Sequence, residues 1–233
     1  MILLIDGHTF RYETENLCNM FFPLDKAKVI EGDQTQEKNY ILTRVSRRAV
    51  GSTAEVFLHI EGTQRSEQVL IPENSTQKEM EYRLCALLYQ MLSAFTGKTL
   101  SWGMLTGVRP VKLVRAMREE GMDDLSILRT MQQRYFVSEK KARLCLATCD
   151  HETPILQGVS RDSFSLYVSI PFCPSRCHYC SFVSQAVGKQ KKLIPDYVHL
   201  LCRELKRTGE IVKSLGLRLD TVYFGGALPF PAG

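Results

Sequence analysis

The sequence predicts an α/β protein in two parts: an N-terminal α+β accessory domain, followed by the first β/α units of an incomplete parallel barrel. Strand-like runs fill residues 1–72 and helical stripes fill 75–150, which together make the accessory domain. Residues 163–233 show instead the order strand, loop, helix, strand, which is typical of parallel strands joined by a crossover helix. The polar segment 151–162 is the expected linker, because it is punctuated by Pro154 and Gly158.

Composition and charge exclude several classes of protein. The net charge of +5 is only mildly basic, and no basic patch is interleaved with aromatic residues, so we expect no nucleic-acid partner. No apolar run approaches the roughly 20 residues that a membrane span needs. The start Met1–Asp6 has no basic region and is not a signal peptide. Eight cysteines without a secretory signal indicate a reducing, cytoplasmic location, where clustered thiols more often hold metal than form disulfides.

The first domain begins as a small α+β unit and ends as a helical one. A helix over Thr9–Phe22 follows a strand over Met1–Ile5. Further strands are expected at Lys26–Glu31, Tyr40–Arg44, Glu55–Glu61 and Gln68–Ile71, the last two joined at a Gly62-Thr63 turn. A capping box at Ser75 or Thr76 with Glu79 opens an apolar stripe that ends at Gly97. Shorter helices are expected over Pro110–Gly121, Leu125–Tyr135 and Ser138–Cys149.

Outside the second half, no residue pattern predicts chemistry strongly. Cys18, Cys85 and Cys202 lie among apolar residues at helical spacing and are expected to be core thiols. Cys145 and Cys149 share a helix face and could ligate metal, but no third ligand is near them in the sequence.

The second half has its chemistry at two strand ends. An apolar strand, Leu166–Ile170, leads into a cysteine-containing loop. A helix from Pro195 to Gly216 follows, and the next strand, Leu219–Phe224, ends in Gly225-Gly226. Because ligands of parallel sheets bind at the carboxyl ends of the strands, the loop and the glycines can face one shared ligand.

Cys173, Cys177 and Cys180 are spaced C-x3-C-x2-C on this loop. Each thiolate can bind one iron of a four-iron cluster. Protein cages for such clusters use four cysteines, so a set of three leaves one iron open to a small molecule. The alternative is a zinc site with His178 as fourth ligand, although a ligand adjacent to Cys177 makes tetrahedral closure awkward.

The residues Tyr167–Cys173, with Cys177 and Cys180 and then Val222–Gly226, resemble the radical S-adenosylmethionine superfamily. Within it the chain resembles the oxygen-independent coproporphyrinogen III dehydrogenase/oxidase-like family. The long N-terminal extension that contains Leu105–Pro110 resembles the HemZ-type branch. The resemblance implies that the second half is the start of a radical S-adenosylmethionine (β/α) barrel.

The resemblance also implies cofactors. The three cysteines would hold a 4Fe–4S cluster whose open iron chelates the amine and carboxylate of S-adenosyl-L-methionine. Tyr179 would lie by the adenosyl part and Tyr167 near the cluster. Gly225 and Gly226 would let the backbone approach the methionine part, since glycine has no Cβ. One electron would then cleave the cofactor to a 5′-deoxyadenosyl radical.

The function that the family implies is oxidative decarboxylation of the propionates of coproporphyrinogen III to vinyls, in heme biosynthesis. The implied partners are a tetrapyrrole and an electron donor such as flavodoxin or ferredoxin. The dehydrogenases, however, carry a cysteine two positions after the third ligand, where this chain has Phe182. Heme chaperones of the family also lack that cysteine, so a heme-binding chaperone without dehydrogenase activity is the alternative.

A second departure follows Gly226. The family continues Gly-Gly-Gly-Thr-Pro, whereas this chain reads Ala227-Leu228-Pro229. Codons for Gly-Thr-Pro preceded by one extra G can be read as Ala-Leu-Pro, so we hypothesise a frameshift after Gly226. On this hypothesis the chain is a C-terminally truncated and inactive fragment. Resequencing tests it, since an uninterrupted gene with no barrel-coding sequence in another frame would exclude a frameshift.

Overall fold

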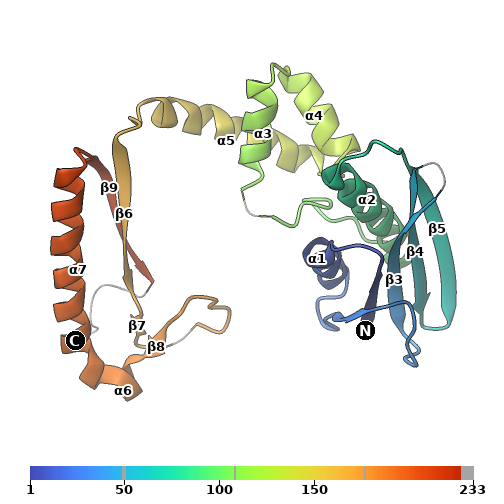
Figure 1. Cartoon of the computed structure of the whole chain (residues 1–233), viewed down its shortest axis with the longest axis horizontal. Coiled ribbons are helices and arrows are strands. Elements are labelled where there is room, and N and C mark those ends of the chain that lie inside the picture. The colour runs from blue at the N-terminus through green and yellow to red at the C-terminus, as the bar shows by residue number, and fades with distance from the viewer. Residues whose placement is uncertain (49–50, 108, 176, 227–233) are drawn as a thin grey trace. The chain divides into compact units, whose positions relative to one another are not determined.

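The computed structural model describes residues 1–48, 51–107, 109–175 and 177–226. It divides after His151 into two compact units, whose elements are labelled in Figure 1. The chain is mixed α/β, as the sequence predicts: an N-terminal sheet with helices is followed by partial β/α units. The hypothesis of a frameshift concerns Ala227–Pro229, which lie outside the described residues.

The sheet of the first unit combines parallel and antiparallel pairs. β1 runs parallel to both β2 and β3, whereas β3, β4 and β5 are antiparallel. The order across the sheet is β2-β1-β3-β4-β5. The strands are β1 (Ile2–Asp6), β2 (Lys28–Glu31), β3 (Tyr40–Arg47), β4 (Ser52–Ile60) and β5 (Thr63–Ile71).

The hairpin between β4 and β5 differs from the sequence expectation. Its turn is Glu61-Gly62, one residue earlier than expected, and both residues have positive φ (53° and 76°), as a two-residue hairpin loop of this type requires. β5 begins at Thr63 rather than Gln68. Its first residues are all polar and exposed because β5 lies at the edge of the sheet. An edge strand of this kind lacks the apolar alternation by which strands are recognised.

Two helices pack on the sheet and close the main core. They are α1 (Arg11–Phe21) and α2 (Gln77–Thr96). The Thr76 hydroxyl accepts a hydrogen bond from the Glu79 amide at 3.2 Å, so Thr76 is the cap of α2. Gly97 ends the helix in the left-handed conformation, as the sequence predicts. The core they share includes Leu3, Leu17, Phe21, Ile41, Cys18, Leu58, Leu84, Cys85 and Leu88.

Three helices form a second core in the same unit: α3 (Val111–Glu119), α4 (Asp124–Gln133) and α5 (Glu139–Gln157). Cys145 and Cys149 are buried in it, each 1% exposed. α5 runs past Cys149 into the segment expected to be a linker and includes Pro154. A proline removes one helical hydrogen bond, and on this exposed final turn water can satisfy the carbonyl that loses its partner.

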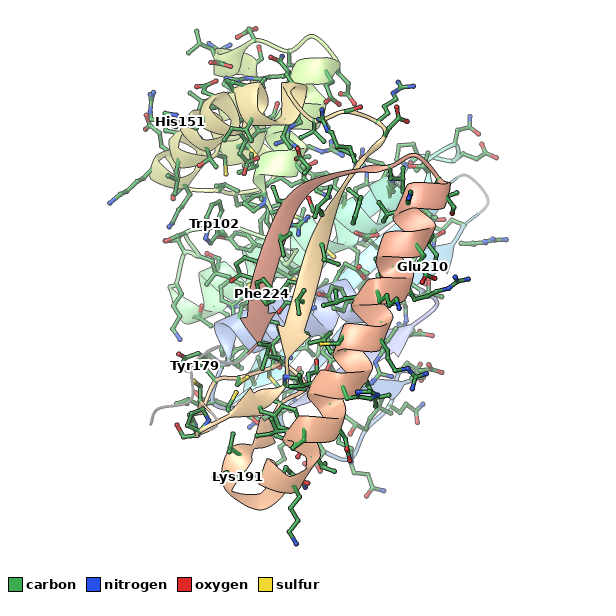
Figure 2. The ribbon with its side chains drawn as sticks, turned by 90° about the vertical axis from the view of Figure 1, so that its left-hand side faces the viewer. Trp102, His151, Tyr179, Lys191, Glu210 and Phe224 are labelled. Carbon is green, nitrogen blue, oxygen red and sulfur yellow. The ribbon has the colours of Figure 1, made fainter. Side chains whose placement is uncertain are left out.

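The second unit is a βαβ arrangement. β6 (Ser163–Ile170) pairs in parallel with β9 (Arg218–Gly226), and the long helix α7 (Ile194–Ser214) lies between them in the chain. Both strands begin a few residues earlier than the sequence indicates. The short elements before α7 are β7 (Phe172–Cys173), β8 (Gln185–Ala186), α6 (Val187–Gln190) and the 3-10 turn η1 (Lys191–Leu193). Figure 2 shows α7 running alongside the two strands.

The two faces of the β6–β9 pair differ. Successive strand residues point to opposite faces. Val168 is 2% exposed, whereas its neighbour Tyr167 is 52% exposed and Tyr223, the register partner of Tyr167, is 65% exposed. Cys202, expected in a core, is exposed on α7. The expectation was wrong because, among the described residues, α7 has no fully buried side chain.

Candidate functional site

The cysteine loop is closed at its base. Phe172 and Cys173 pair in parallel with Gln185 and Ala186, and the Gln185 amide donates to the Pro171 carbonyl at 2.6 Å. The loop therefore leaves and rejoins the chain directly after the carboxyl end of β6. This closure fixes both ends of the segment that carries the three cysteines predicted as ligands.

The three thiols lie on one loop but are not gathered into a ligand set. Cys173 and Cys180 are half-buried and Cys177 is exposed. The Cys180 amide donates to the Cys177 carbonyl at 3.0 Å, which forms a tight turn between these two residues. Among the described residues no group of three metal-binding side chains is close enough to hold an ion. Arg176, inside the motif, lies outside the described residues.

The donor set fits an iron–sulfur cluster in its chemistry. None of the three cysteines is in a disulfide, and all have some exposure. Thiolates are the soft ligands that such clusters use. Soft donors on a loop with a closed base are able to converge on an ion without unfolding a core. The fourth potential zinc ligand, His178, is exposed on the same loop.

Tyr179 lies inside the loop and is 88% exposed. A hydrogen bond with the Cys177 side chain raises the pKa of the Tyr179 phenol, and the nearby Cys177 and Cys180 charges raise it further. The phenol therefore keeps its proton next to the thiols. Figure 2 labels this residue near the end of β6.

Tyr167 and Gly225 meet at the end of the strand pair. The Tyr167 ring stacks on the Tyr223 ring, with centroids 5.5 Å apart and an interplanar angle of 17°. A Cβ atom at position 225 would lie 2.8 Å from the Tyr167 hydroxyl oxygen and 2.7 Å from Tyr223 Cε1. Glycine at 225 is therefore required here by the two tyrosines.

The end of β9 lies beside the start of the cysteine loop. Ser169 is in register with Gly225, and Ile170 with Gly226. The structure thus brings the glycine pair and the entrance of the loop together, as expected for carboxyl ends of parallel strands. Tyr179, by contrast, has no printed contact with Tyr167, and its recorded interactions are with the thiols.

Three residues of this region carry contacts that the sequence reading did not single out. Tyr223 stacks on Tyr167. The Ser184 hydroxyl lies 3.9 Å from Cys180 Sγ. Tyr197 of α7 donates a hydrogen bond to the Ser169 carbonyl. A hydroxyl four residues from a cysteine in the loop was a signal that could have identified Ser184, whereas the other two contacts depend on strand register and helix placement.

Comparison with known proteins adds independent evidence. The chain is 27% identical over 223 residues to the oxygen-independent coproporphyrinogen-III oxidase-like protein HemZ of Bacillus subtilis, which covers 92% of this chain and 44% of that protein. Shorter matches of 67 residues link it to the heme chaperone HemW of Synechocystis (39% identical, 27% of this chain and 15% of that protein) and of Escherichia coli (36%, 28% and 16%). No family model and no solved structure matches the chain.

These relatives define a class of heme-related proteins. Within it, the chain belongs to the oxygen-independent coproporphyrinogen-III oxidase-like family, together with HemZ. The chain spans less than half the length of that relative. In the part of the chain that the structure describes, no helix is long and apolar enough to cross a membrane.

Proposed function

We propose that this chain carries the cofactor site of a radical S-adenosyl-L-methionine oxidoreductase, with a 4Fe–4S cluster on Cys173, Cys177 and Cys180. One observation carries the proposal. The loop that bears the thiols is closed at its base and starts at the carboxyl end of β6, beside the glycine end of the paired strand β9. A reducing compartment such as the cytoplasm keeps such thiols available.

The chain's own residues would bind and orient the cofactors. The three thiolates hold the cluster and leave one iron open. Tyr179, which keeps its proton, offers a ring and a hydroxyl next to that position. Gly225 and Gly226 expose backbone at the end of β9, and Tyr167 lies over Gly225. When bound, the cluster and S-adenosyl-L-methionine supply one-electron chemistry that ends in hydrogen abstraction.

The proposed substrate is a tetrapyrrole. The name of the longest-matching relative reported above is that of a coproporphyrinogen-III oxidase-like protein. The lead activity is therefore coproporphyrinogen III dehydrogenase-like, an oxidative decarboxylation of propionates to vinyls. It needs an electron donor such as flavodoxin or ferredoxin.

A heme chaperone is the second candidate, and one residue favours it. Phe182, 62% exposed, stands where the dehydrogenases have a further cysteine. Several heme chaperones are also among the relatives. Heme titration of the reconstituted chain, beside a porphyrinogen consumption assay, separates the two. Stoichiometric heme binding without porphyrinogen loss favours the chaperone, and porphyrinogen loss favours the dehydrogenase.

Anaerobic reconstitution with iron and sulfide tests the cluster itself. We expect about four irons per chain and expect Cys173→Ala, Cys177→Ala and Cys180→Ala each to lose most of them. Cys202→Ala is the matched control, because Cys202 is an exposed cysteine outside the loop. Equal iron loss in the control would contradict the proposal. A zinc site would instead bind one zinc and weaken on His178→Ala, which should leave the iron content unchanged.

A further inference from the structure

The entrance of the cysteine loop is attached to the crossover helix by one side chain. Tyr197 lies in the first turn of α7, after Pro195. Its hydroxyl donates a hydrogen bond to the Ser169 carbonyl near the end of β6. This links the helix to the strand at the point where the chain turns toward Cys173.

The Tyr197 ring makes a second contact on the far side of this turn. It packs edge-on against Phe172, with ring centroids 5.2 Å apart and an interplanar angle of 77°. Such aromatic pairs stabilise beyond the area they bury. Ser169 and Phe172 flank Ile170-Pro171, and Phe172 directly precedes Cys173. The two contacts therefore hold both sides of the segment that presents the first thiol.

The base of the loop supplies the rest of the constraint. The Gln185 amide bonds to the Pro171 carbonyl, between the two residues that Tyr197 touches. Phe172 and Cys173 are held by β8 on one side, and the Phe172 ring by Tyr197. Ligands of a cofactor are placed well only when their supporting residues are themselves fixed by packing and hydrogen bonds.

We propose that Tyr197 is a positioning residue of the cysteine site: through its bond to Ser169 and its packing on Phe172 it sets where Cys173 presents its thiol. The inference rests on the proposed function for its purpose, but its geometry can be measured without any cofactor. Tyr197 itself is not a ligand of the cluster.

The first test measures thiol alkylation in the metal-free full chain by peptide mass spectrometry. Cys173 is half-buried and Cys177 is exposed, so Cys177 is an internal reference. Loss of one hydrogen bond in Tyr197→Phe should raise the rate at Cys173 about threefold to tenfold relative to Cys177. Tyr197→Leu, which also loses the ring contact, should raise it further. Tyr12→Phe, an exposed tyrosine of α1, should change nothing.

The second test uses the reconstituted chain and reads the cluster. We expect Tyr197→Phe to release iron to a chelator about threefold to tenfold faster than the parent and to alter the electron paramagnetic resonance spectrum of the reduced cluster. Leu166→Ala, which removes part of a half-buried side chain of β6, is the control for general destabilisation. It should leave the spectrum of its loaded fraction unchanged.

The outcomes separate the two proposals. If the parent takes up no cluster, the proposed function fails while the alkylation test still decides the role of Tyr197. If the parent takes up its cluster but Tyr197→Phe and Tyr197→Leu match it in alkylation and iron release, the positioning role is overturned and the cluster proposal stands.

Discussion

Ile170 and Gly226 form the last register pair of β6 and β9, so the residue that leads into the cysteine loop lies beside the residue that ends the second strand. Gly226 has a φ of +99°, and a Cβ atom there would lie 2.8 Å from the Ile170 carbonyl oxygen. Glycine thus permits both the backbone conformation and the close approach. The two strand ends can meet at one site because of this residue.

Gly226→Ala should loosen the end of the strand pair. The left-handed backbone and the contact with Ile170 together should cost about 1–3 kcal/mol. Faster hydrogen exchange of the β6 amides is the measurement. The matched control is Gly209→Ala within α7, where a Cβ meets nothing within 4 Å. It should stabilise the helix by about 0.5–1 kcal/mol. Unchanged exchange in Gly226→Ala would show that the strand ends do not meet as described.

Gly225→Ala tests the place of Tyr167. The new Cβ would displace the Tyr167 and Tyr223 rings, since it would lie within 3 Å of both. We expect a loss of about 1–2 kcal/mol, because overpacking forces side chains off their preferred rotamers. In a background of Tyr167→Ala the same substitution should cost less, which a double-mutant cycle measures in urea unfolding. Additive effects would mean that the tyrosine does not lie over this glycine.

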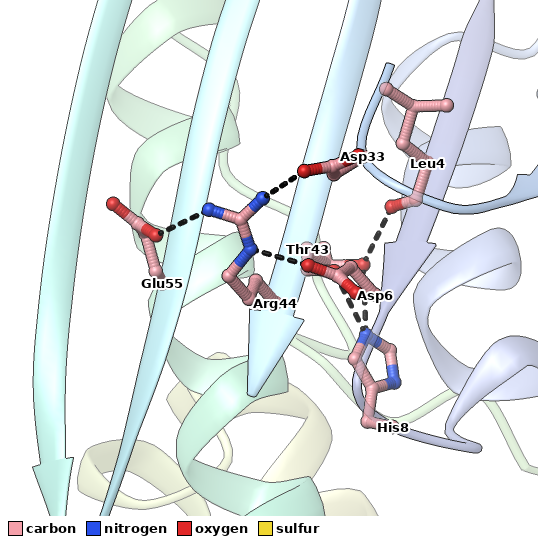
Figure 3. Close-up of polar contacts among 7 residues, drawn as sticks. All are labelled: Leu4, Asp6, His8, Asp33, Thr43, Arg44 and Glu55. Carbon is pink, nitrogen blue, oxygen red and sulfur yellow. Dashed lines mark hydrogen bonds and ion pairs between the residues drawn. The ribbon is translucent and has the colours of Figure 1, made fainter. Parts of the chain in front are cut away.

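His8 predicts how the first unit responds to acid. Its Nδ1 accepts from the Phe10 amide at 3.1 Å, and Nε2 lies 3.2 Å from the Thr43 carbonyl, so the ring is held neutral with its proton on Nε2 (Figure 3). Burial lowers the pKa of His8 from 6.5, against the opposing effects of the Thr43 carbonyl and the Asp6 charge. Below about pH 6.5 the unfolded chain therefore binds more protons than the folded one, and stability falls with pH.

The measurement is the free energy of unfolding at pH 7 and pH 5 for the parent and for His8→Gln. The parent should lose more stability on acidification than the variant, which has no titrating ring at that position. Other groups titrate alike in both proteins and cancel in the comparison. Parallel losses would show that His8 is not held neutral in the folded state.

Much of the fold follows from local signals. Thr76 with Glu79, the apolar stripe and Gly97 define α2 almost completely, because each signal acts within one helix turn. The polar start of β5 and the final turn of α5 were missed. The edge of a sheet needs no apolar alternation, and Pro154 does not end an exposed helix. These features are decided by what surrounds the segment, which local patterns do not contain.

The site divides in the same way. The cysteine spacing and the two glycines are visible in the sequence, but the contacts around them are not. A bulge between Phe164 and Ser165 shifts the register of β6 against β9. That shift brings Tyr223, rather than Val222, beside Tyr167. Tyr197 is likewise found only in the structure, since its partner is the backbone carbonyl of Ser169, which any residue would provide.

The central claim is that three thiols of one loop hold a four-iron cluster with one iron open. Mössbauer spectroscopy of the iron-57-reconstituted full chain, with and without S-adenosyl-L-methionine, tests it most directly. The account predicts a cluster in which one iron of about four changes its signal when S-adenosyl-L-methionine is added, and predicts that Cys177→Ala forms no such cluster while Cys202→Ala does. A spectrum that S-adenosyl-L-methionine leaves unchanged, or a cluster that survives Cys177→Ala, would contradict it.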